Sequence, residues 1–73
     1  MPTKSVQELL ADNNAEHKAL TQAAMDNTKV AYRAAKNESQ NIHLPISTRM
    51  EAYARAKALG AEWRRMRDFR DSL

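Results

Sequence analysis

Residues that break helices are scarce in this chain, and that scarcity strongly limits what it can fold into. The 73 residues include one glycine and two prolines, and both β-branched and aromatic residues are few. Glycine and proline interrupt helices, whereas β-branched and aromatic residues favour strands. The sequence therefore predicts an all-α protein, organised as a single helical domain over residues 1–73.

The N-terminal region predicts a short helix over about residues 5–12 and a main helix over about residues 14–37. Ser5 and Glu8 have the spacing of a capping box, in which each side chain binds a free amide of the first turn. The polar run at residues 12–14 then competes for backbone hydrogen bonds. We expect this run to break or kink the helix.

A loop over residues 38–47 and a second main helix over residues 48–72 complete the predicted domain. Pro45 lacks a backbone donor and disfavours helix at the residue before it. Thr48 and Glu51 again have capping-box spacing. We therefore place the start of the second helix at Thr48.

Each main helix carries an apolar stripe at steps of three and four residues, which predicts that the two helices pack together. The stripe of the first helix consists of Leu20, Ala23, Ala24, Val30, Ala31 and Ala34. The stripe of the second helix consists of Ala52, Ala56, Leu59, Trp63 and Met66. An antiparallel helical hairpin sets small residues opposite large ones across these stripes. The expected neighbours are Ala31 with Ala56, Ala23 and Ala24 with Trp63, and Leu20 with Met66.

Three further features bear on how the helices associate. Met25 and Tyr32 form a lesser stripe, which is either a partner surface or a scatter of exposed apolar residues. Gly60 inside the second helix marks either a close helix approach or a tolerated glycine. Because 13 of the apolar residues are alanine, the core is small. We therefore expect a homo-oligomer or a part of a complex, for instance two hairpins dimerising into a four-helix bundle.

Positive charge is concentrated in the second helix, although the whole chain carries a net charge of only +3 at pH 7. Its last turns interleave aromatic residues with arginine, which forms two-pronged hydrogen bonds to carboxylate or phosphate. The candidate partner-binding residues are Trp63, Arg64, Arg65, Arg67, Phe69 and Arg70. Four arginines cannot share one helix face, so we expect these turns to project from the bundle or to be clasped by a partner.

Neutralisation within the fold is the alternative interpretation of this arginine cluster. An antiparallel hairpin could bring Glu8, Asp12 and Glu16 alongside the arginines as exposed ion pairs. Favourable interaction with the helix dipole could account for one or two of the arginines, but not for four. Both interpretations stay open from the sequence.

No pattern in the sequence points to catalysis or to a cofactor. Cysteine is absent, which excludes disulfides and thiolate metal sites. His17 and His43 lie far apart and have no carboxylate at metal-ligand spacing on the same helical face. Glycine-rich phosphate loops and nucleophile motifs are missing as well. We therefore expect no enzymatic activity, no cofactor and no bound metal.

Apolar runs are short throughout the sequence. None approaches the length of a membrane span, and the N-terminal residues lack the apolar core of a signal peptide. We therefore expect a soluble cytoplasmic protein with no membrane among its partners.

Binding to a larger macromolecule is the function that these features favour. The leading hypothesis is a non-enzymatic regulatory protein whose basic, aromatic second helix docks onto the acidic surface of a larger protein. Nucleic-acid binding is one alternative, in which the arginines contact phosphates, although +3 is a small net charge for that role. A structural subunit or assembly factor of a larger particle, for instance a viral one, is another.

Overall fold

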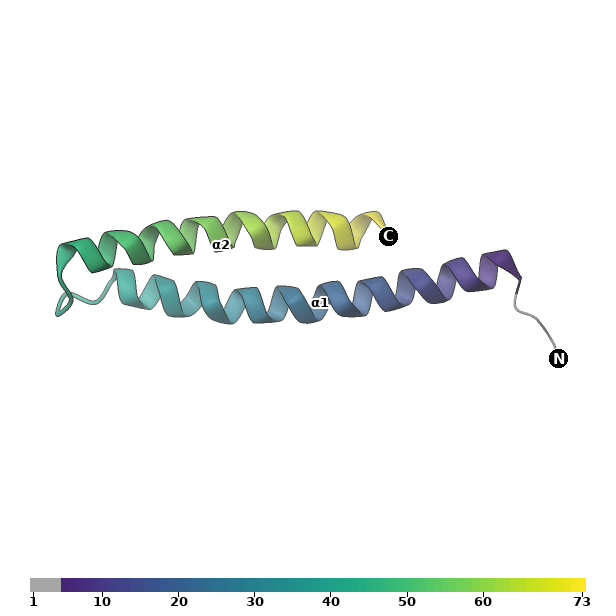
Figure 1. Ribbon diagram of the computed structural model, residues 1–73, viewed down its shortest axis with the longest axis horizontal. Helices are drawn as coiled ribbons and strands as arrows, with labels where there is room; N and C mark the ends of the chain where they lie inside the picture. The colour runs from purple at the N-terminus through teal and green to yellow at the C-terminus, as the bar shows by residue number, and fades with distance from the viewer. Residues whose placement is uncertain (1–4) are drawn as a thin grey trace.

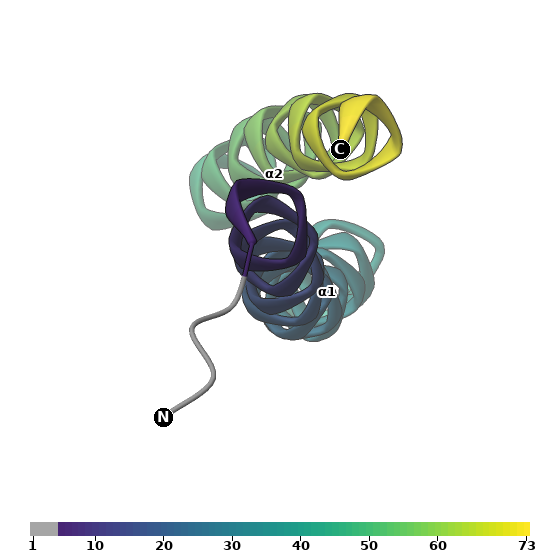
Figure 2. The same cartoon turned by 90° about the vertical axis from the view of Figure 1, so that its right-hand side faces the viewer.

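Two long α-helices joined by a short loop form the protein, whose computed structural model describes residues 5–73. Helix α1 spans Val6–Ser39 and helix α2 spans Ile46–Ser72. The helices run antiparallel and side by side (Figure 1), and the end-on view separates them as two rods (Figure 2). No strand occurs in the described range, so the predicted all-α hairpin is confirmed. Residues 1–4 lie outside that range. The prediction that the chain carries no signal peptide rested partly on them.

Helix α1 continues through the polar run at residues 12–14, so the prediction of a separate short N-terminal helix is wrong. Asp and Asn each cost only a few tenths of a kcal/mol inside a helix, and no glycine or proline adds to that cost here. The predicted cap is present, because the Ser5 hydroxyl oxygen accepts a hydrogen bond from the backbone N–H of Glu8 at 3.2 Å. One helix of 34 residues results.

Helix α2 begins at Ile46 rather than at Thr48, so the loop is shorter than predicted. Pro45 occupies the N-cap position with φ of −58°, and its carbonyl accepts a hydrogen bond from the N–H of Arg49 at 3.0 Å. No side chain caps this helix, so the predicted capping box at Thr48 is wrong. Proline is tolerated at a helix start because its φ is fixed near the helical value, and the first N–H groups of α2 are left without a side-chain acceptor.

Two arginines of α2 tie its first half to the end of α1. Arg49 Nε donates a hydrogen bond to the backbone carbonyl of Ser39 at 3.2 Å. Arg55 forms a hydrogen-bonded ion pair with Glu38, with Nη2 and Oε2 separated by 2.7 Å. The loop end of the hairpin is therefore held by polar contacts as well as by packing.

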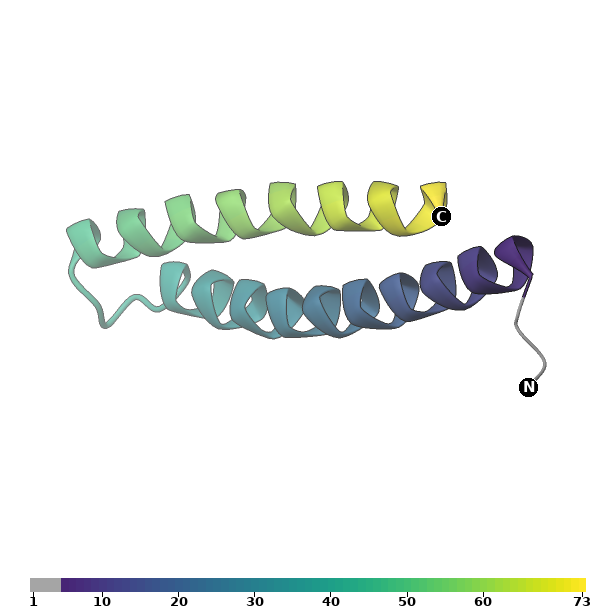
Figure 3. The same ribbon diagram turned by 45° about the vertical axis from the view of Figure 1, so that its right-hand side comes forward.

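At the far end of the hairpin, α1 projects and α2 does not. Arg70 Nη1 donates a hydrogen bond to Gln22 Oε1 at 2.7 Å, which places the last turns of α2 beside the middle of α1. The N-terminal turns of α1 extend beyond that point (Figures 1 and 3), and every residue from 5 to 20 is exposed. The expectation that the arginine-rich turns project is therefore wrong for Arg70.

The core between the helices is small, and the residues that α2 contributes to it belong to the predicted stripe. The buried apolar residues are Met25, Ala35, Ala52 and Ala56. The other members of the α2 stripe, Leu59, Trp63 and Met66, are half-buried. The predicted packing face of α2 is therefore confirmed.

Helix α1 packs against α2 with a different face from the predicted one. We call the face that packs the inner seam; its buried and half-buried positions are Thr21, Met25, Thr28, Tyr32, Ala35 and Ser39. The predicted stripe is exposed instead, with 63% of Leu20 and 68% of Val30 accessible. Alanine buries little area, whereas Met25 and Tyr32 fill the space that the small residues of α2 leave.

This change of face also alters the predicted neighbours. Ala31, Ala23 and Ala24 are exposed, so they do not cover Ala56 or Trp63. Tyr32 takes the place opposite Gly60, where a methyl group on the glycine would lie 3.5 Å from Tyr32 Cε2. The close approach at the glycine is thus made by an aromatic ring, at ordinary van der Waals distance.

Candidate functional site

The six candidate partner-binding residues do not form one surface. Trp63, Arg64 and Arg67 lie on one side of the hairpin, along a groove between the helices. Arg65 and Phe69 lie on the opposite side, where they line a hollow together with Leu20, Thr21, Ala24, Glu62 and Met66. Arg70 is engaged within the fold, since it binds Gln22 and pairs with Asp71 at 3.0 Å. Trp63, Arg64 and Arg67 are therefore the only three of the six that share the groove.

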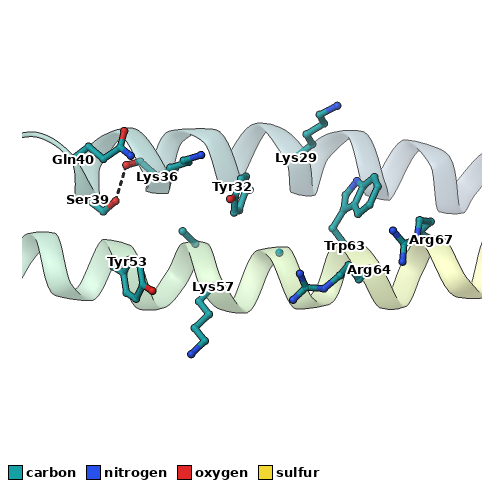
Figure 4. A pocket seen from close by; sticks show the side chains of 12 residues that line it. Lys29, Tyr32, Lys36, Ser39, Gln40, Tyr53, Lys57, Trp63, Arg64 and Arg67 are labelled. Atoms are coloured by element: carbon teal, nitrogen blue, oxygen red, sulfur yellow. Dashed lines mark hydrogen bonds between the residues drawn. The ribbon is translucent and has the colours of Figure 1, made fainter.

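We call the groove on the Trp63 side the basic groove. Its volume is about 630 Å³, and it runs along both helices (Figure 4). The five cations that line it are Lys29, Lys36, Lys57, Arg64 and Arg67, and the three aromatic residues are Tyr32, Tyr53 and Trp63. The remaining lining residues are Ser39, Gln40, Ala56 and Gly60. Carboxylates are absent from this lining, so nothing in the groove itself neutralises the cations.

The floor of the groove is aromatic. Tyr32 from α1 and Trp63 from α2 both point into the space between the helices (Figure 4). The guanidinium of Arg67 lies 5.6 Å from the centroid of the Trp63 ring, a cation–π distance. Because both rings are half-buried, each is held by packing and still presents part of its surface to a ligand.

Most of the groove cations have no partner within the described part of the chain. Arg67 pairs with Asp68 at 3.3 Å, a surface contact of small value. Lys57 and Arg64 make no side-chain hydrogen bond or ion pair with any residue from 5 to 73. A ligand carboxylate or phosphate would therefore not have to displace an internal partner from them.

The ion pairs of the structure test the alternative interpretation, in which acidic residues of α1 neutralise the arginines. In the described residues, arginine pairs with Glu38, Asp68 and Asp71. Glu8 and Glu16 lie on the projecting turns of α1, beyond the last turns of α2. Neutralisation through these two residues is therefore not part of the hairpin.

The sequence analysis missed three groove residues, Lys29, Lys36 and Lys57, whereas it had placed Tyr32 on a possible partner surface. Their signal was present as spacing. Lys29 and Lys36 stand seven residues apart on α1, and Lys57 and Arg64 stand seven apart on α2. Such pairs lie on one helix face, but which face borders the groove depends on how α1 packs. Because the sequence analysis chose the wrong packing face of α1, it did not recognise that these residues border one groove.

The described range contains neither a metal-binding cluster nor a membrane-spanning helix. No three His, Cys, Asp or Glu side chains gather in a metal-binding arrangement within residues 5–73. Neither helix is both long enough and apolar enough to cross a bilayer. The basic groove can bind through charge, hydrogen bonding and aromatic contact.

Comparison with known proteins supplies no relative from which a function could be transferred. No family model, no curated protein and no solved structure matches the chain. The groove and the remaining surface are therefore the features from which a function can be inferred.

Proposed function

We propose that the protein is a non-enzymatic binding protein whose basic groove takes an acidic helix of a larger partner protein. One observation carries the proposal: five cations and three aromatic residues line a single groove that contains no carboxylate. Acidic side chains of a partner would meet the cations, while its apolar side chains would pack on the rings.

The spacing of the cations favours a helical ligand. Lys29 and Lys36 on one rim, and Lys57 and Arg64 on the other, are each seven residues apart, or about 10.5 Å along a helix. A third helix lying between α1 and α2 repeats its own side chains at the same interval. Glu or Asp at seven-residue spacing on both of its flanks would therefore match both rims.

The length of the groove sets the length of the ligand. On α2 its lining extends from Tyr53 to Arg67, which corresponds to about 21 Å of helix. About four helical turns fill that length, with apolar residues facing Trp63 and Tyr32. A ligand of this kind uses the helix-in-groove mode of recognition.

Calorimetric titration with a designed peptide tests the proposal. The probe is a helical peptide of about 15 residues with Glu at seven-residue spacing on both flanks and Leu between them. We expect Arg64→Glu to weaken its binding about tenfold or more, because the variant places a carboxylate against the peptide's own. Arg65→Glu is the matched control, since it makes the same charge change one residue away on the opposite side of the hairpin.

Two results would overturn the proposal. One is equal loss of affinity in the Arg64→Glu and Arg65→Glu variants, which would indicate attraction by net charge alone. The other is equal binding of a peptide in which every Glu is replaced by Lys. In either case the basic groove would not be a site for an acidic helix.

Single-stranded nucleic acid is the second candidate ligand, favoured by the combination of cations with exposed aromatic surface. Tyr53 is 64% exposed, and bases stack on such rings while phosphates meet the flanking cations. Quenching of Trp63 fluorescence by a short oligothymidylate, with affinity that falls steeply as salt rises, is expected for this function. Unchanged fluorescence at low salt argues against it.

The proposal also includes self-association of the hairpin, as in a four-helix bundle or as a subunit of a larger particle. The supporting observation is a set of five large apolar residues of α1 that stay exposed, namely Val6, Leu9, Leu10, Leu20 and Val30. Exposed apolar residues that gather along one side of a helix can mark an interface. Light scattering coupled to gel filtration measures the oligomeric state, and a strictly monomeric chain would contradict this part of the proposal.

A further inference from the structure

The large exposed apolar residues of α1 lie on, or next to, one row of exposed positions. Leu10 and Leu20 lie on a row of exposed positions that alternate steps of three and four residues from Leu10 to Ala34, which we call the outer seam. Val6 continues this row by one step towards the N-terminus, while Leu9 and Val30 each directly precede one of its positions. The outer seam therefore has the spacing of a coiled-coil interface, but α2 does not cover it.

The outer seam is symmetric under reversal of the helix direction. Its steps from Leu10 read three, four, three, four, three, four, three, and they read the same from Ala34 backwards. Two copies of α1 laid antiparallel can therefore match step for step along the whole seam. Leu10 then lies opposite Ala34 of a second copy, and Leu20 lies opposite its Ala24.

The chemistry of the matched positions is also complementary. The larger leucines meet alanines in the layers named above, which fills space without overlap. In the remaining layers His17 meets Asn27, so each finds a polar partner, whereas Asn13 meets Ala31 and is left to solvent at the edge of the seam. The flanking Leu9 and Val30 lie at the same edge, where an antiparallel copy would cover both.

Charge selects the antiparallel arrangement over the parallel one. Residues 5–20 of α1 carry three carboxylates against one lysine, whereas residues 21–39 carry three cations against two carboxylates. An antiparallel pair brings the net-negative residues 5–20 of each chain towards the net-positive part of the other hairpin, to which α2 contributes most of the positive charge, since Lys29 and Lys36 do not line the seam. A parallel pair would set acidic beside acidic.

We propose that a second copy of this chain binds along the outer seam, with the two α1 helices antiparallel and Leu10 opposite Ala34. The projecting turns of each α1 then pack along the outer seam of the other hairpin, from its middle towards its loop end. The inference rests on the self-association proposed above and not on the ligand of the basic groove. Lys29 and Lys36 lie on the far side of α1, so both basic grooves stay open in the dimer.

Cysteine cross-linking tests this register, because the natural chain contains no cysteine. A mixture of Leu10→Cys and Ala34→Cys chains, one of them carrying a mass tag, is oxidised and analysed by mass spectrometry. We expect cross-links between the two variants but none within either variant alone, because equivalent positions lie about 36 Å apart along the helix axis. Ala54→Cys, at an exposed position of α2, is the control and should stay unlinked.

The oligomeric state provides a second measurement. Sedimentation equilibrium should show a dimer whose dissociation constant rises about tenfold or more in Leu20→Glu, with no change in Ala54→Glu. Leu20→Glu should leave binding at the basic groove unchanged. A wild-type chain that stays monomeric overturns the self-association itself. A dimer in which Leu10→Cys links to its own copy overturns the antiparallel register alone.

Discussion

The inner seam and the outer seam lie on the same helix, yet α2 covers only one of them. On the inner seam Met25 keeps 1% of its surface exposed, whereas on the outer seam Leu20 keeps 63%. The inner seam has large residues opposite the alanines and the glycine of α2, and the outer seam consists of two leucines, three alanines and three polar residues. Fit to the partner helix, rather than the number of apolar residues, therefore decides which face of α1 packs within the chain.

The largest expected difference between the two seams is in the free energy of unfolding. Met25→Ala should lower it by about 2–5 kcal/mol, because it removes the largest fully buried side chain and leaves a cavity. Leu20→Ala should cost under about 1 kcal/mol at dilutions where the chain is monomeric. Urea unfolding followed by circular dichroism measures both. Equal losses in the dilute protein would mean that both seams are buried within one chain.

A larger side chain in the interface between α2 and the inner seam should have the next largest effect on the free energy of unfolding. Ala52 is 0% exposed, so Ala52→Leu forces methyl groups between the helices and should cost about 1–3 kcal/mol. Ala54→Leu, at an exposed position of the same helix, should change stability by less than about 0.5 kcal/mol. Thermal unfolding of the two variants compares them directly, and a tolerated leucine at position 52 would argue against the close packing of α2 on the inner seam.

A gain in stability is expected at Gly60. Gly60→Ala should stabilise the protein by up to about 1 kcal/mol, since alanine favours helix and its methyl group would contact the Tyr32 ring at an ordinary distance. Chemical unfolding of the variant at the same concentration as the wild type gives the difference. A loss of stability would indicate that the glycine is needed for closer approach than Tyr32 makes.

The smallest effect concerns the polar contacts at the edge of the inner seam. Glu38→Gln removes the ion pair with Arg55, which is largely exposed, and should cost under about 1 kcal/mol. Added salt should reduce that cost further, because it screens exposed charges. Glu51→Gln removes a carboxylate that pairs with nothing among residues 5–73 and serves as the control. A cost that is large or independent of salt would assign the pair a structural role.

The sequence predicted the elements of this fold better than their faces. The helices, the Ser5 cap and the stripe of α2 followed from local propensity and spacing, which a single chain segment carries in itself. The face of α1 depends instead on which side chains fit opposite Gly60 and Ala56, and that information is split between two distant segments. Counting alanines as apolar favoured the exposed stripe of Leu20, Ala23, Ala24, Val30, Ala31 and Ala34 instead.

The candidate site was predicted only in part for the same reason. Trp63, Arg64 and Arg67 share the basic groove, but Arg65 and Phe69 lie across the hairpin from it. Adjacent residues of a helix point in different directions, so residues that are close together in the sequence do not necessarily form one surface. The lysines and tyrosines that complete the groove come from both helices, and only the packing of α1 brings them together.

Contact between Tyr32 and Gly60 tests the central claim most directly, because it can form only if the inner seam faces α2. Nuclear Overhauser spectroscopy should show cross-peaks between the Tyr32 ring protons and the α-protons of Gly60, because a methyl group on that glycine would lie only 3.5 Å from Tyr32 Cε2. Cross-peaks between the methyl groups of Ala31 and Ala56, without the Tyr32 signals, would instead mean that the outer seam packs on α2. That result would contradict the arrangement of both surfaces.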